Sequence, residues 1–207
     1  MKVLFATNNP AKIHYYAEAL EEKGIEVITL KDIDTQVEIE ENGKTAVENA
    51  KIKAEGYYKL VHIPTVAIDD NLFLEGIPEE NQPGTHVRRV NGKRLNDDEM
   101  IQYYTTMVHQ YGGQVEAKWV KGIAVYDGKE MKTFCKSRDS FYFLDHASLV
   151  RHEGYPLDSI AYVPEFKKYL SELTPEEEKV YRRFQNANGE MIEFIWKSLE
   201  EMGEKNG

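Results

Sequence analysis

The first residues of the chain pass from a buried strand through a polar turn into a helix, and this order constrains the fold more than any other feature. Val3 to Ala6 is a short apolar run that predicts a buried strand. Thr7 to Pro10 is a turn, and Ala11 to Lys23 follows with apolar residues at helical spacing. Gly24 ends that helix, and Ile25 to Leu30 predicts a second strand. Together these elements have the size of one strand–helix–strand crossover unit.

The rest of the chain combines further strands with a hairpin. Thr65 to Ile68 is another short apolar run, and Leu72 to Asn91 is predicted to be a long irregular segment because Gly and Pro interrupt it. Val115 to Tyr126 and Glu130 to Tyr142 flank Asp127-Gly128, a dipeptide typical of a tight hairpin turn. We therefore expect an α/β or α+β fold with a mixed sheet.

Further helices are predicted by apolar spacing and by capping residues. The expected ranges are Thr45 to Leu60, Asp97 to Tyr111, Thr174 to Phe184 and Met191 to Met202. Thr45 and Glu48 have the spacing of a capping box at the start of the first of these helices. Helices near the two ends of the chain are expected to pack together, and the tail from Gly203 is expected to fray.

Composition excludes several classes of protein. The 207 residues suffice for one domain, or for two lobes that share a sheet. The formal charge of -10 argues against a duplex nucleic-acid binder, which needs a basic face. The apolar run near the N-terminus is too short for a signal peptide or a membrane span. Cys135 is the one cysteine, which fits a reducing cytoplasm, and we expect it to be a small buried residue of a strand.

Thr7 to Lys12 is the first candidate site, because it lies between a predicted strand and a predicted helix. A helix N-terminus presents free backbone N–H groups and partial positive charge, which suit a phosphate. Thr7 and Asn9 add polar groups, and Lys12 adds a charge one turn into the helix. The alternative is an N-capping turn whose side chains only satisfy the backbone.

Asp69 and Asp70 are the second candidate, since they directly follow the apolar run that ends at Ile68. Ligands of α/β sheets bind outside the carboxyl ends of strands. Two carboxylates there suit a hard cation such as Mg²⁺, or one can orient a water while the other binds the metal. The alternative is a solvated turn.

Three further groups of residues carry weaker signals. Glu38, Glu40 and Glu41 precede a helix that carries Lys51 and Lys53, and they would join the Asp69-Asp70 site if they are not simply solvated. Aromatic and basic residues together can hold a base and its phosphates. Two sets have this character: Tyr155, Asp158, Lys179, Arg182 and Arg183, and His86, Arg88 and Arg89 beside Pro83-Gly84.

Taken in order, these segments resemble the inosine triphosphate pyrophosphatase family, which hydrolyses non-standard purine nucleoside triphosphates to the monophosphate and pyrophosphate. That family opens with a strand and a Thr-x-Asn-x-x-Lys turn, matched by Thr7, Asn9 and Lys12. An acidic loop, a Thr and a Glu-Asn-Ala-x-x-Lys-Ala stretch follow, matched from Glu40 to Ala54. The family's Asp-Asp-Ser-Gly-Leu segment is Asp69 to Leu72 here, with Asn71 for the Ser and no Gly.

The resemblance weakens in the second half of the chain. A Pro-Gly with an Arg five residues on is matched by Pro83-Gly84 and Arg89. The family's Gly-Phe-Gly-Tyr-Asp-Pro-like loop has only a distorted echo from Glu153 to Ile160, and its Ala-Glu-Leu-x-x-x-Glu-Lys stretch is echoed from Ser171 to Lys179. The Ser-His-Arg motif that reads the purine 6-keto edge in the family is replaced by residues 180–185, Val-Tyr-Arg-Arg-Phe-Gln.

The resemblance implies a role for each matching residue. Asp70 would be the general base or water-orienting carboxylate, and Glu41 and Asp69 would hold Mg²⁺, with Asp70 as a further ligand. Lys12 and Lys53 would neutralise phosphate charge, Lys53 as part of the catalytic set. The remaining substrate contacts implied are Thr7, Asn9, Asn71, Arg89, Tyr155, Asp158 and Lys179.

The resemblance also implies the overall organisation. The family fold is α/β, a long mixed sheet bent around a central cleft between two lobes, with helices on both faces, and we expect residues 1–207 to form one such domain. A cytoplasmic homodimer with a nucleoside triphosphate substrate is implied. Two alternatives remain: a family member retargeted to another nucleotide, and a regulatory protein that binds nucleotide without turnover. Retention of Asp70, Lys12 and Lys53 argues against the second, whereas Asn71 and the absent Ser-His-Arg favour it.

Overall fold

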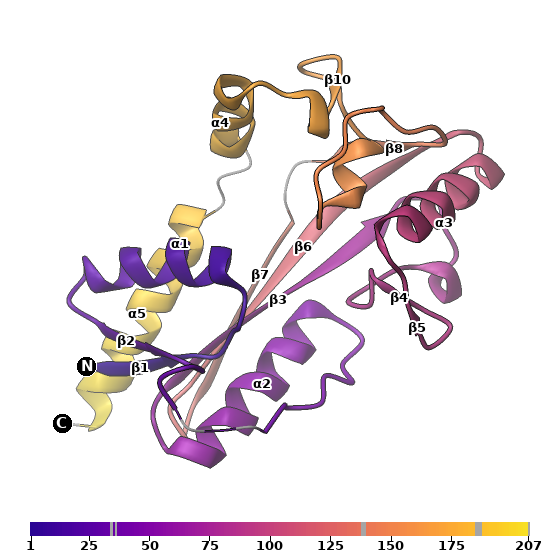
Figure 1. Cartoon of the computed structure of the whole chain (residues 1–207). Helices are drawn as coiled ribbons and strands as arrows, with labels where there is room; N and C mark the ends of the chain where they lie inside the picture. Colours follow the sequence, from indigo (N-terminus) through magenta and orange to yellow (C-terminus); the bar gives the residue numbers. More distant parts are fainter. Residues whose placement is uncertain (34, 36, 138–139, 185–187, 207) are drawn as a thin grey trace. The chain divides into compact units, whose positions relative to one another are not determined.

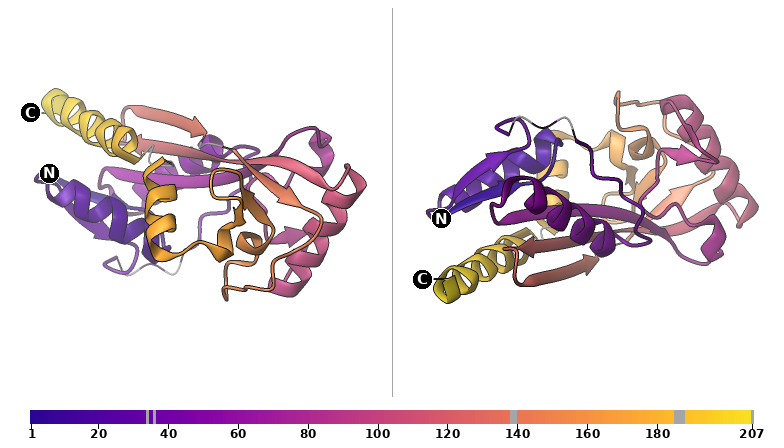
Figure 2. Two further views of the ribbon diagram at one scale, coloured as in Figure 1. Left: turned by 90° about the horizontal axis from the view of Figure 1, so that it is seen from above. Right: turned by 90° about the horizontal axis from the view of Figure 1, so that it is seen from below.

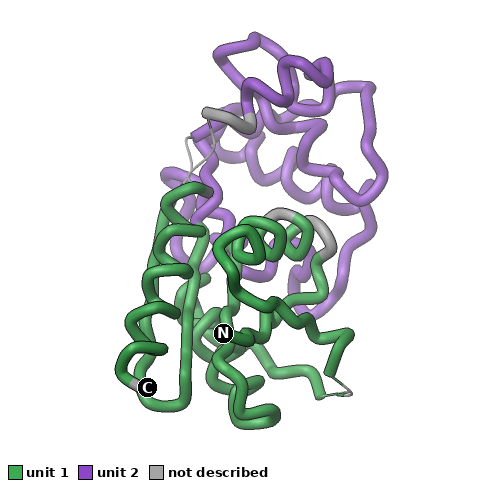
Figure 3. The backbone as a smooth tube through the Cα atoms, turned by 90° about the vertical axis from the view of Figure 1, so that its left-hand side faces the viewer, with its two compact units in different colours: residues 1–70, 121–136, 187–207 green, residues 71–120, 137–186 purple. Residues whose placement is uncertain are grey.

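The chain folds into two compact units. The computed structural model describes residues 1–33, 35, 37–137, 140–184 and 188–206. The first unit comprises residues 1–70, 121–136 and 187–207, and the second comprises residues 71–120 and 137–186 (Figure 3). Two long strands, β3 (Thr65–Leu74) and β6 (Gln114–Tyr126), contribute residues to both units.

The first unit is built around the predicted crossover. β1 pairs in parallel with β2 and also with β3, and β6 lies next to β3 in the strand order. β7 pairs with the other long strand, β6. Besides parts of β3 and β6, the unit holds β1 (Lys2–Phe5), α1 (Pro10–Glu21), β2 (Glu26–Thr29), α2 (Ala46–Val61), β7 (Met131–Ser137) and α5 (Asn188–Asn206) (Figure 1).

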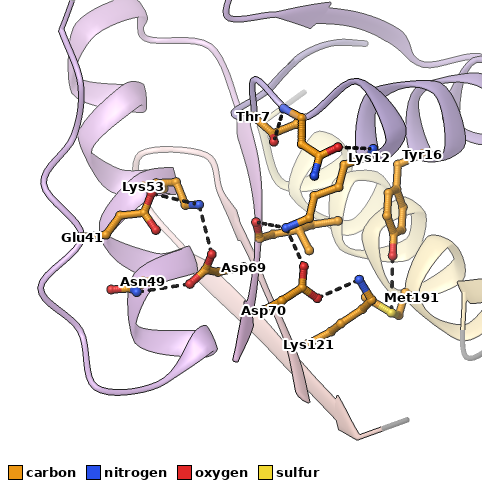
Figure 4. A network of polar contacts seen from close by, with 12 residues as sticks. Thr7, Lys12, Tyr16, Glu41, Asn49, Lys53, Asp69, Asp70, Lys121 and Met191 are labelled. Atoms are coloured by element: carbon orange, nitrogen blue, oxygen red, sulfur yellow. Dashed lines mark hydrogen bonds and ion pairs between the residues drawn. The ribbon is translucent and has the colours of Figure 1, made fainter. Parts of the chain in front are cut away.

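Helices cover both faces of the sheet in the first unit. Side chains alternate along β1, so Val3 and Phe5 pack with α1 and α5, while Leu4 packs with α2 on the opposite face. α1 and α5 lie side by side (Figure 2). The Tyr16 hydroxyl of α1 donates to Met191 Sδ of α5 at 3.6 Å (Figure 4). The strands are apolar on both faces because both faces are covered.

Gly122 fixes how α2 packs on β6. A Cβ at this position would lie 2.3 Å from Val47 N and 2.4 Å from the Ala46 carbonyl carbon. The N-terminal turn of α2 therefore touches the strand backbone directly, which only a glycine allows. This contact places α2, and with it Asn49 and Lys53, against the sheet.

The second unit has its own core, in which α3 packs against antiparallel strands. β6 pairs with β8, β8 with β9 and β9 with β10, all antiparallel. Buried side chains of β3, α3, β6 and β8 meet there, Tyr104 and Phe143 among them. The elements besides β3 and β6 are 3-10 turns at Glu79–Asn81, Pro156–Ser159 and Leu170–Glu172, strands β4 (Arg89–Val90), β5 (Lys93–Arg94), β8 (Phe141–Leu144), β9 (Ala161–Val163) and β10 (Lys168–Tyr169), and helices α3 (Asp97–Gln110) and α4 (Pro175–Phe184).

The predicted α/β class with a mixed sheet is confirmed, because parallel and antiparallel pairs occur in one strand order, β10-β9-β8-β6-β3-β1-β2. The predicted packing of the terminal helices is also found, as α1 on α5. Within the described residues, none of the helices has the length and apolar character that crossing a membrane requires. The bend of the sheet around a cleft stays a prediction.

Several predicted boundaries are wrong. β3 does not end at Ile68 but continues to Leu74, because Leu72 and Leu74 are buried in the core of the second unit, so Leu72–Asn91 is not irregular throughout. The predicted second hairpin strand from Glu130 to Tyr142 is two strands, β7 and β8, and both pair with β6.

Three local predictions also need correction. The capping box at α2 is half formed: the Thr45 side chain accepts from Glu48 N, but the Glu48 carboxylate accepts from Lys44 N. Cys135 is in a strand but exposed, because its neighbour Phe134 takes the inward position. The tail does not fray at Gly203; α5 continues to Asn206, and a Cβ at Gly203 would lie 2.6 Å from Met1 Cε.

Candidate active site

The turn after β1 is an N-capping turn that also delivers a lysine. Thr7 is buried, and its hydroxyl accepts a hydrogen bond from Asn9 N at 3.1 Å. Asn9 Oδ1 accepts from Lys12 N at 3.3 Å, so Asn9 acts as a cap of α1. The Lys12 side chain then reaches from the first turn of α1 to β3, where its ammonium donates to Ile68 O at 3.2 Å (Figure 4). The turn therefore caps α1 and also places the Lys12 ammonium beside β3.

Asp70 is held between two lysines. Lys12 Nζ lies 2.8 Å from Asp70 Oδ2, and Lys121 Nζ lies 2.7 Å from Asp70 Oδ1 (Figure 4). Burial by itself raises the pKa of the Asp70 carboxyl, but the two ammonium groups outweigh burial and hold the pKa well below its usual range. Asp70 is therefore a carboxylate at any physiological pH.

Asp69 belongs to a second group of charges around Lys53. Lys53 Nζ lies 3.5 Å from Asp69 Oδ1 and 3.2 Å from Glu41 Oε1. The other oxygen of Asp69 accepts from Asn49 Nδ2 at 3.1 Å. Asn49 Oδ1 in turn accepts from Gly43 N at 2.7 Å, so one buried amide joins the acidic loop, α2 and β3.

The two neighbouring aspartates point to opposite faces of β3. Successive side chains of a strand alternate, and Asp70 shares the face of Val66 and Ile68, which α1 and α5 cover. Asp69 shares the face of Ala67, which α2 covers. One lysine–carboxylate group therefore lies on each side of the strand, and the two aspartates do not form one paired site as their sequence adjacency suggested.

The predicted Mg²⁺ ligands are only partly brought together. In the described part of the chain, no three His, Cys, Asp or Glu side chains are arranged to bind a metal ion. Glu41 and Asp69 nevertheless converge on one cation, the Lys53 ammonium, and carboxylate oxygens are the ligands that Mg²⁺ prefers. This pair fits Mg²⁺, whereas Asp70 faces away from it and is paired with lysines.

A cavity of about 280 Å³ lies beside the α2 face of the site. Thr7, Glu41 and Lys53 line it together with other residues of the first unit. The cavity far exceeds the volume of one water, roughly 30 Å³, so it has room for a ligand. Four candidate residues named in the sequence analysis, Thr7, Glu38, Glu41 and Lys53, thus line one cavity.

The predicted base-binding residues belong to the second unit. Tyr155 and Asp158 line a pocket of about 320 Å³, together with Trp119, Phe141, Phe143, His152, Glu178 and Tyr181. Lys179 is exposed on α4 and is not among the residues that line this pocket. Arg89 is exposed on β4 beside a smaller basic pocket with Arg88 and Arg94. Asn71 follows Asp70 in β3 and is half-buried. Gln185, at the end of the segment that replaces Ser-His-Arg, lies outside the described residues.

Two residues of the site escaped the sequence analysis. Lys121 lies in β6 directly before the apolar run from Ile123 to Val125. A lysine inside a predicted buried strand was the available signal, because lysine is rarely buried without a partner. Asn49 belongs to the quoted Glu-Asn-Ala stretch, but its bond to Asp69 depends on how α2 packs on β3.

Comparison with solved structures identifies the fold. The chain is similar to a HAM1 protein of Coxiella burnetii, with a TM-score of 0.77, 25% identity, and coverage of 97% of this chain and 99% of that one. The Ham1 protein of Staphylococcus aureus has the same fold, with a TM-score of 0.77 at 24% identity over 96% of this chain and all of the other. The sequence model of the Ham1 family matches residues 3–194. The chain therefore belongs to the Ham1 family.

Curated relatives cover most of the chain. A dITP/XTP pyrophosphatase of Aquifex aeolicus is 33% identical over 186 residues, 86% of this chain and 88% of its own length. The dITP/XTP pyrophosphatase of Thermoanaerobacter pseudethanolicus is 27% identical over 201 residues, 97% of this chain and all of its own. The resemblance inferred from the N-terminal motifs is thereby confirmed and extends well into the second half.

Proposed function

We propose that this protein is a Mg²⁺-dependent hydrolase that converts a nucleoside triphosphate, of the non-standard purine kind, to the monophosphate and pyrophosphate, and so removes such nucleotides from the cellular pool. The observation that carries the proposal is the pair of lysine–carboxylate groups on either side of β3. The predicted enzyme class, a nucleoside triphosphate pyrophosphatase, agrees with the names of the relatives. The substrates in those names, dITP and XTP, support the purine preference.

Charge neutralisation and positioning are what the first unit offers a triphosphate. Phosphoryl-type attack is catalysed mainly by these two effects. Lys12 and Lys53 supply ammonium groups, and the N-terminus of α1 supplies backbone N–H groups and partial positive charge near Thr7 and Asn9. A Mg²⁺ ion held by Glu41 and Asp69 would offset further negative charge of the phosphate chain.

Asp70 is suited to orient the attacking water. In the reaction the water oxygen bonds to the α-phosphorus, the bond from that phosphorus to the bridging oxygen breaks, and pyrophosphate leaves. A general base works best when its pKa lies near the working pH. Lys12 and Lys121 hold the pKa of Asp70 far below the working pH. The carboxylate therefore accepts a hydrogen bond from the water but is too weak a base to take the water's proton. Between the two roles that the resemblance allowed, we favour water orientation.

The preference of the enzyme for one base depends on the pocket of the second unit. The pocket of the second unit combines aromatic faces with the carboxylates of Asp158 and Glu178. Aromatic rings suit any base, whereas carboxylates accept hydrogen bonds from amino groups rather than donate them to a keto oxygen. The carboxylates favour, as a second candidate, an enzyme retargeted to a base that carries an amino group, whereas the hydroxyl groups of Tyr155 and Tyr181 can donate to a keto oxygen, as the leading proposal requires.

One assay separates the candidates. The protein is incubated with Mg²⁺ and inosine, xanthosine, deoxyinosine and standard triphosphates, and pyrophosphate release is measured. Release chiefly from inosine or xanthosine substrates supports the proposal, and release only from amino-bearing bases supports retargeting. Tight binding of every nucleotide without release contradicts both and leaves the regulatory protein.

A variant tests the assigned role of Asp70. Asp70→Asn should lose turnover by about 100-fold or more, since it removes the carboxylate that orients water, and should still bind nucleotide. Asp32→Asn is a matched control, because Asp32 is exposed and accepts hydrogen bonds from Thr29 of its own turn. Equal losses in both variants would contradict the role.

The expected homodimer and cytoplasmic location remain proposals that rest on the resemblance. Light scattering coupled to size-exclusion chromatography measures the mass directly: 23.9 kDa is the mass of one chain, and twice that value is expected. Fractionation of the source cells tests the location.

A further inference from the structure

Lys121 is a buried lysine in the middle of β6 that none of the quoted family motifs includes. Only 9% of its side chain is exposed, less than the 16% of Lys12. Its ammonium lies 2.7 Å from Asp70 Oδ1 (Figure 4). A buried ammonium is costly unless it is paired, so a lysine at this position calls for an explanation.

The strand pattern of β6 directs Lys121 toward Asp70. Lys121 shares a strand face with Ile123 and Val125, which pack in the core with α1 and α5. Asp70 shares the same side of the sheet through Val66 and Ile68 of β3, the neighbouring strand. Both side chains are therefore anchored by rigid sheet backbone, and their contact does not depend on a loop.

Lys12 is anchored differently. It projects from the first turn of α1, beside the turn at Thr7 and Asn9 that is proposed to bind phosphate. Its ammonium also donates to Ile68 O. A triphosphate that arrives at this helix start would compete with Asp70 for Lys12, and Asp70 would lose one of its two partners. A buried carboxylate left without any partner is strongly destabilised.

We propose that Lys121 is a positioning residue, which keeps the Asp70 carboxylate paired and correctly oriented while Lys12 turns to the triphosphate. The inference rests on the proposed function and deepens it by giving the two lysines separate roles. Lys12 binds the substrate, and Lys121 stays paired with Asp70.

The division predicts opposite kinetic effects for the two lysines. Lys121→Met should lower kcat by about 100-fold with KM within about threefold of wild type, because a misplaced catalytic group loses rate without loss of uniform binding. Lys12→Met should raise KM by about tenfold or more, because it removes a substrate contact. Lys121→Arg restores the positive charge and should recover most of kcat.

Lys132→Met is the matched control. Lys132 is a lysine of the same unit with 18% of its side chain exposed, and it forms an ion pair with Glu201 away from the site. Its loss should leave kcat and KM unchanged. Thermal midpoints of all variants are measured alongside. If Lys121→Met does not fold, Lys121→Gln replaces it: an uncharged amide holds the Asp70 carboxylate less firmly than the ammonium does, so kcat should fall below that of Lys121→Arg while KM stays unchanged.

The outcomes separate this inference from the function on which it rests. A rise in KM with unchanged kcat in Lys121→Met would show a phosphate ligand and overturn the positioning role. Unchanged kinetics in that variant, with an active wild-type protein, would overturn this inference alone. A wild-type protein that releases no pyrophosphate from any nucleotide would overturn the proposed function and the inference together.

Discussion

Replacing Gly122 by alanine is the sharpest test of how the site is built. The new methyl group would lie 2.3 Å from Val47 N and 2.7 Å from Ala46 O. Ordinary van der Waals contact begins at 3.4 Å, so the shortfall is 3.4 − 2.3 = 1.1 Å. Both neighbours are helix backbone, which cannot rotate away as a flexible side chain would. The N-terminus of α2 must therefore move by about 1 Å or the strand must bend.

The cost follows from that displacement. Overpacking in a close-packed interior costs about 1–3 kcal/mol, and a backbone clash belongs at the upper end. For a chain of this length, each kcal/mol lowers the thermal midpoint by about 2–4 °C, so a loss of roughly 6–12 °C is expected. The same shift displaces Asn49 and Lys53, and a misplacement of about 1 Å reduces turnover on the order of 100-fold.

Urea unfolding and pyrophosphate release measure the two effects. Gly189→Ala is the control, because nothing lies within 4 Å of a Cβ there and the position lies in the first turn of α5. That variant should be as stable as wild type or more stable, since alanine favours a helix by about 0.5–1 kcal/mol over glycine. If Gly122→Ala unfolds within about 0.5 kcal/mol of wild type, the close approach of α2 to β6 does not hold the site as described.

Three further perturbations have defined outcomes. Thr45→Ala removes the side chain that accepts from Glu48 N and should cost about 1 kcal/mol in urea unfolding, while Thr45→Ser should cost much less; equal losses would contradict the cap. Lys53→Met leaves Glu41 and Asp69 without their common cation, so Mg²⁺ should raise the thermal midpoint of this variant by a few degrees more than that of wild type; an equal response would argue against Mg²⁺ at this pair. The pKa of Asp97 is held below its usual value by hydrogen bonds from the Arg88 side chain and from Gly154 N, so its contribution to stability is full at neutral pH and is lost as the pH falls below about 4. Urea curves of wild type and Asp97→Asn should therefore differ at pH 7 and draw together as the pH falls below about 4, and a constant difference would exclude the linkage.

Local patterns were sufficient to predict the crossover unit and most helices. The turn from Thr7 to Lys12 was placed correctly because a short apolar run followed by a polar turn and helical spacing has few other solutions. The α2 helix was found from its Thr45 cap. These signals act over a few residues, so a single sequence carries them.

The features that were missed depend on contacts between distant segments. β3 continues through Asp69 and Asp70 because lysines from α1, α2 and β6 neutralise their charges. No local sequence pattern around Asp69 indicates those partners. The exposure of Cys135 likewise depends on which face of β7 packs against α5, where Phe134 stacks on Phe194. Lys121 was visible as an anomaly in a strand, but its partner is set by the pairing of β3 with β6.

The alternation along β3 gives the protein two charge groups that can be altered independently. Each aspartate sits on its own side of one strand, with its own lysine and its own covering helix. A substitution around Asn49 or Glu41 can change how cations are held without touching the partners of Asp70. A single-residue insertion before Asp69 would instead exchange the two sides at once. The spacing of this strand must therefore stay intact in any variant that keeps both charge groups in place.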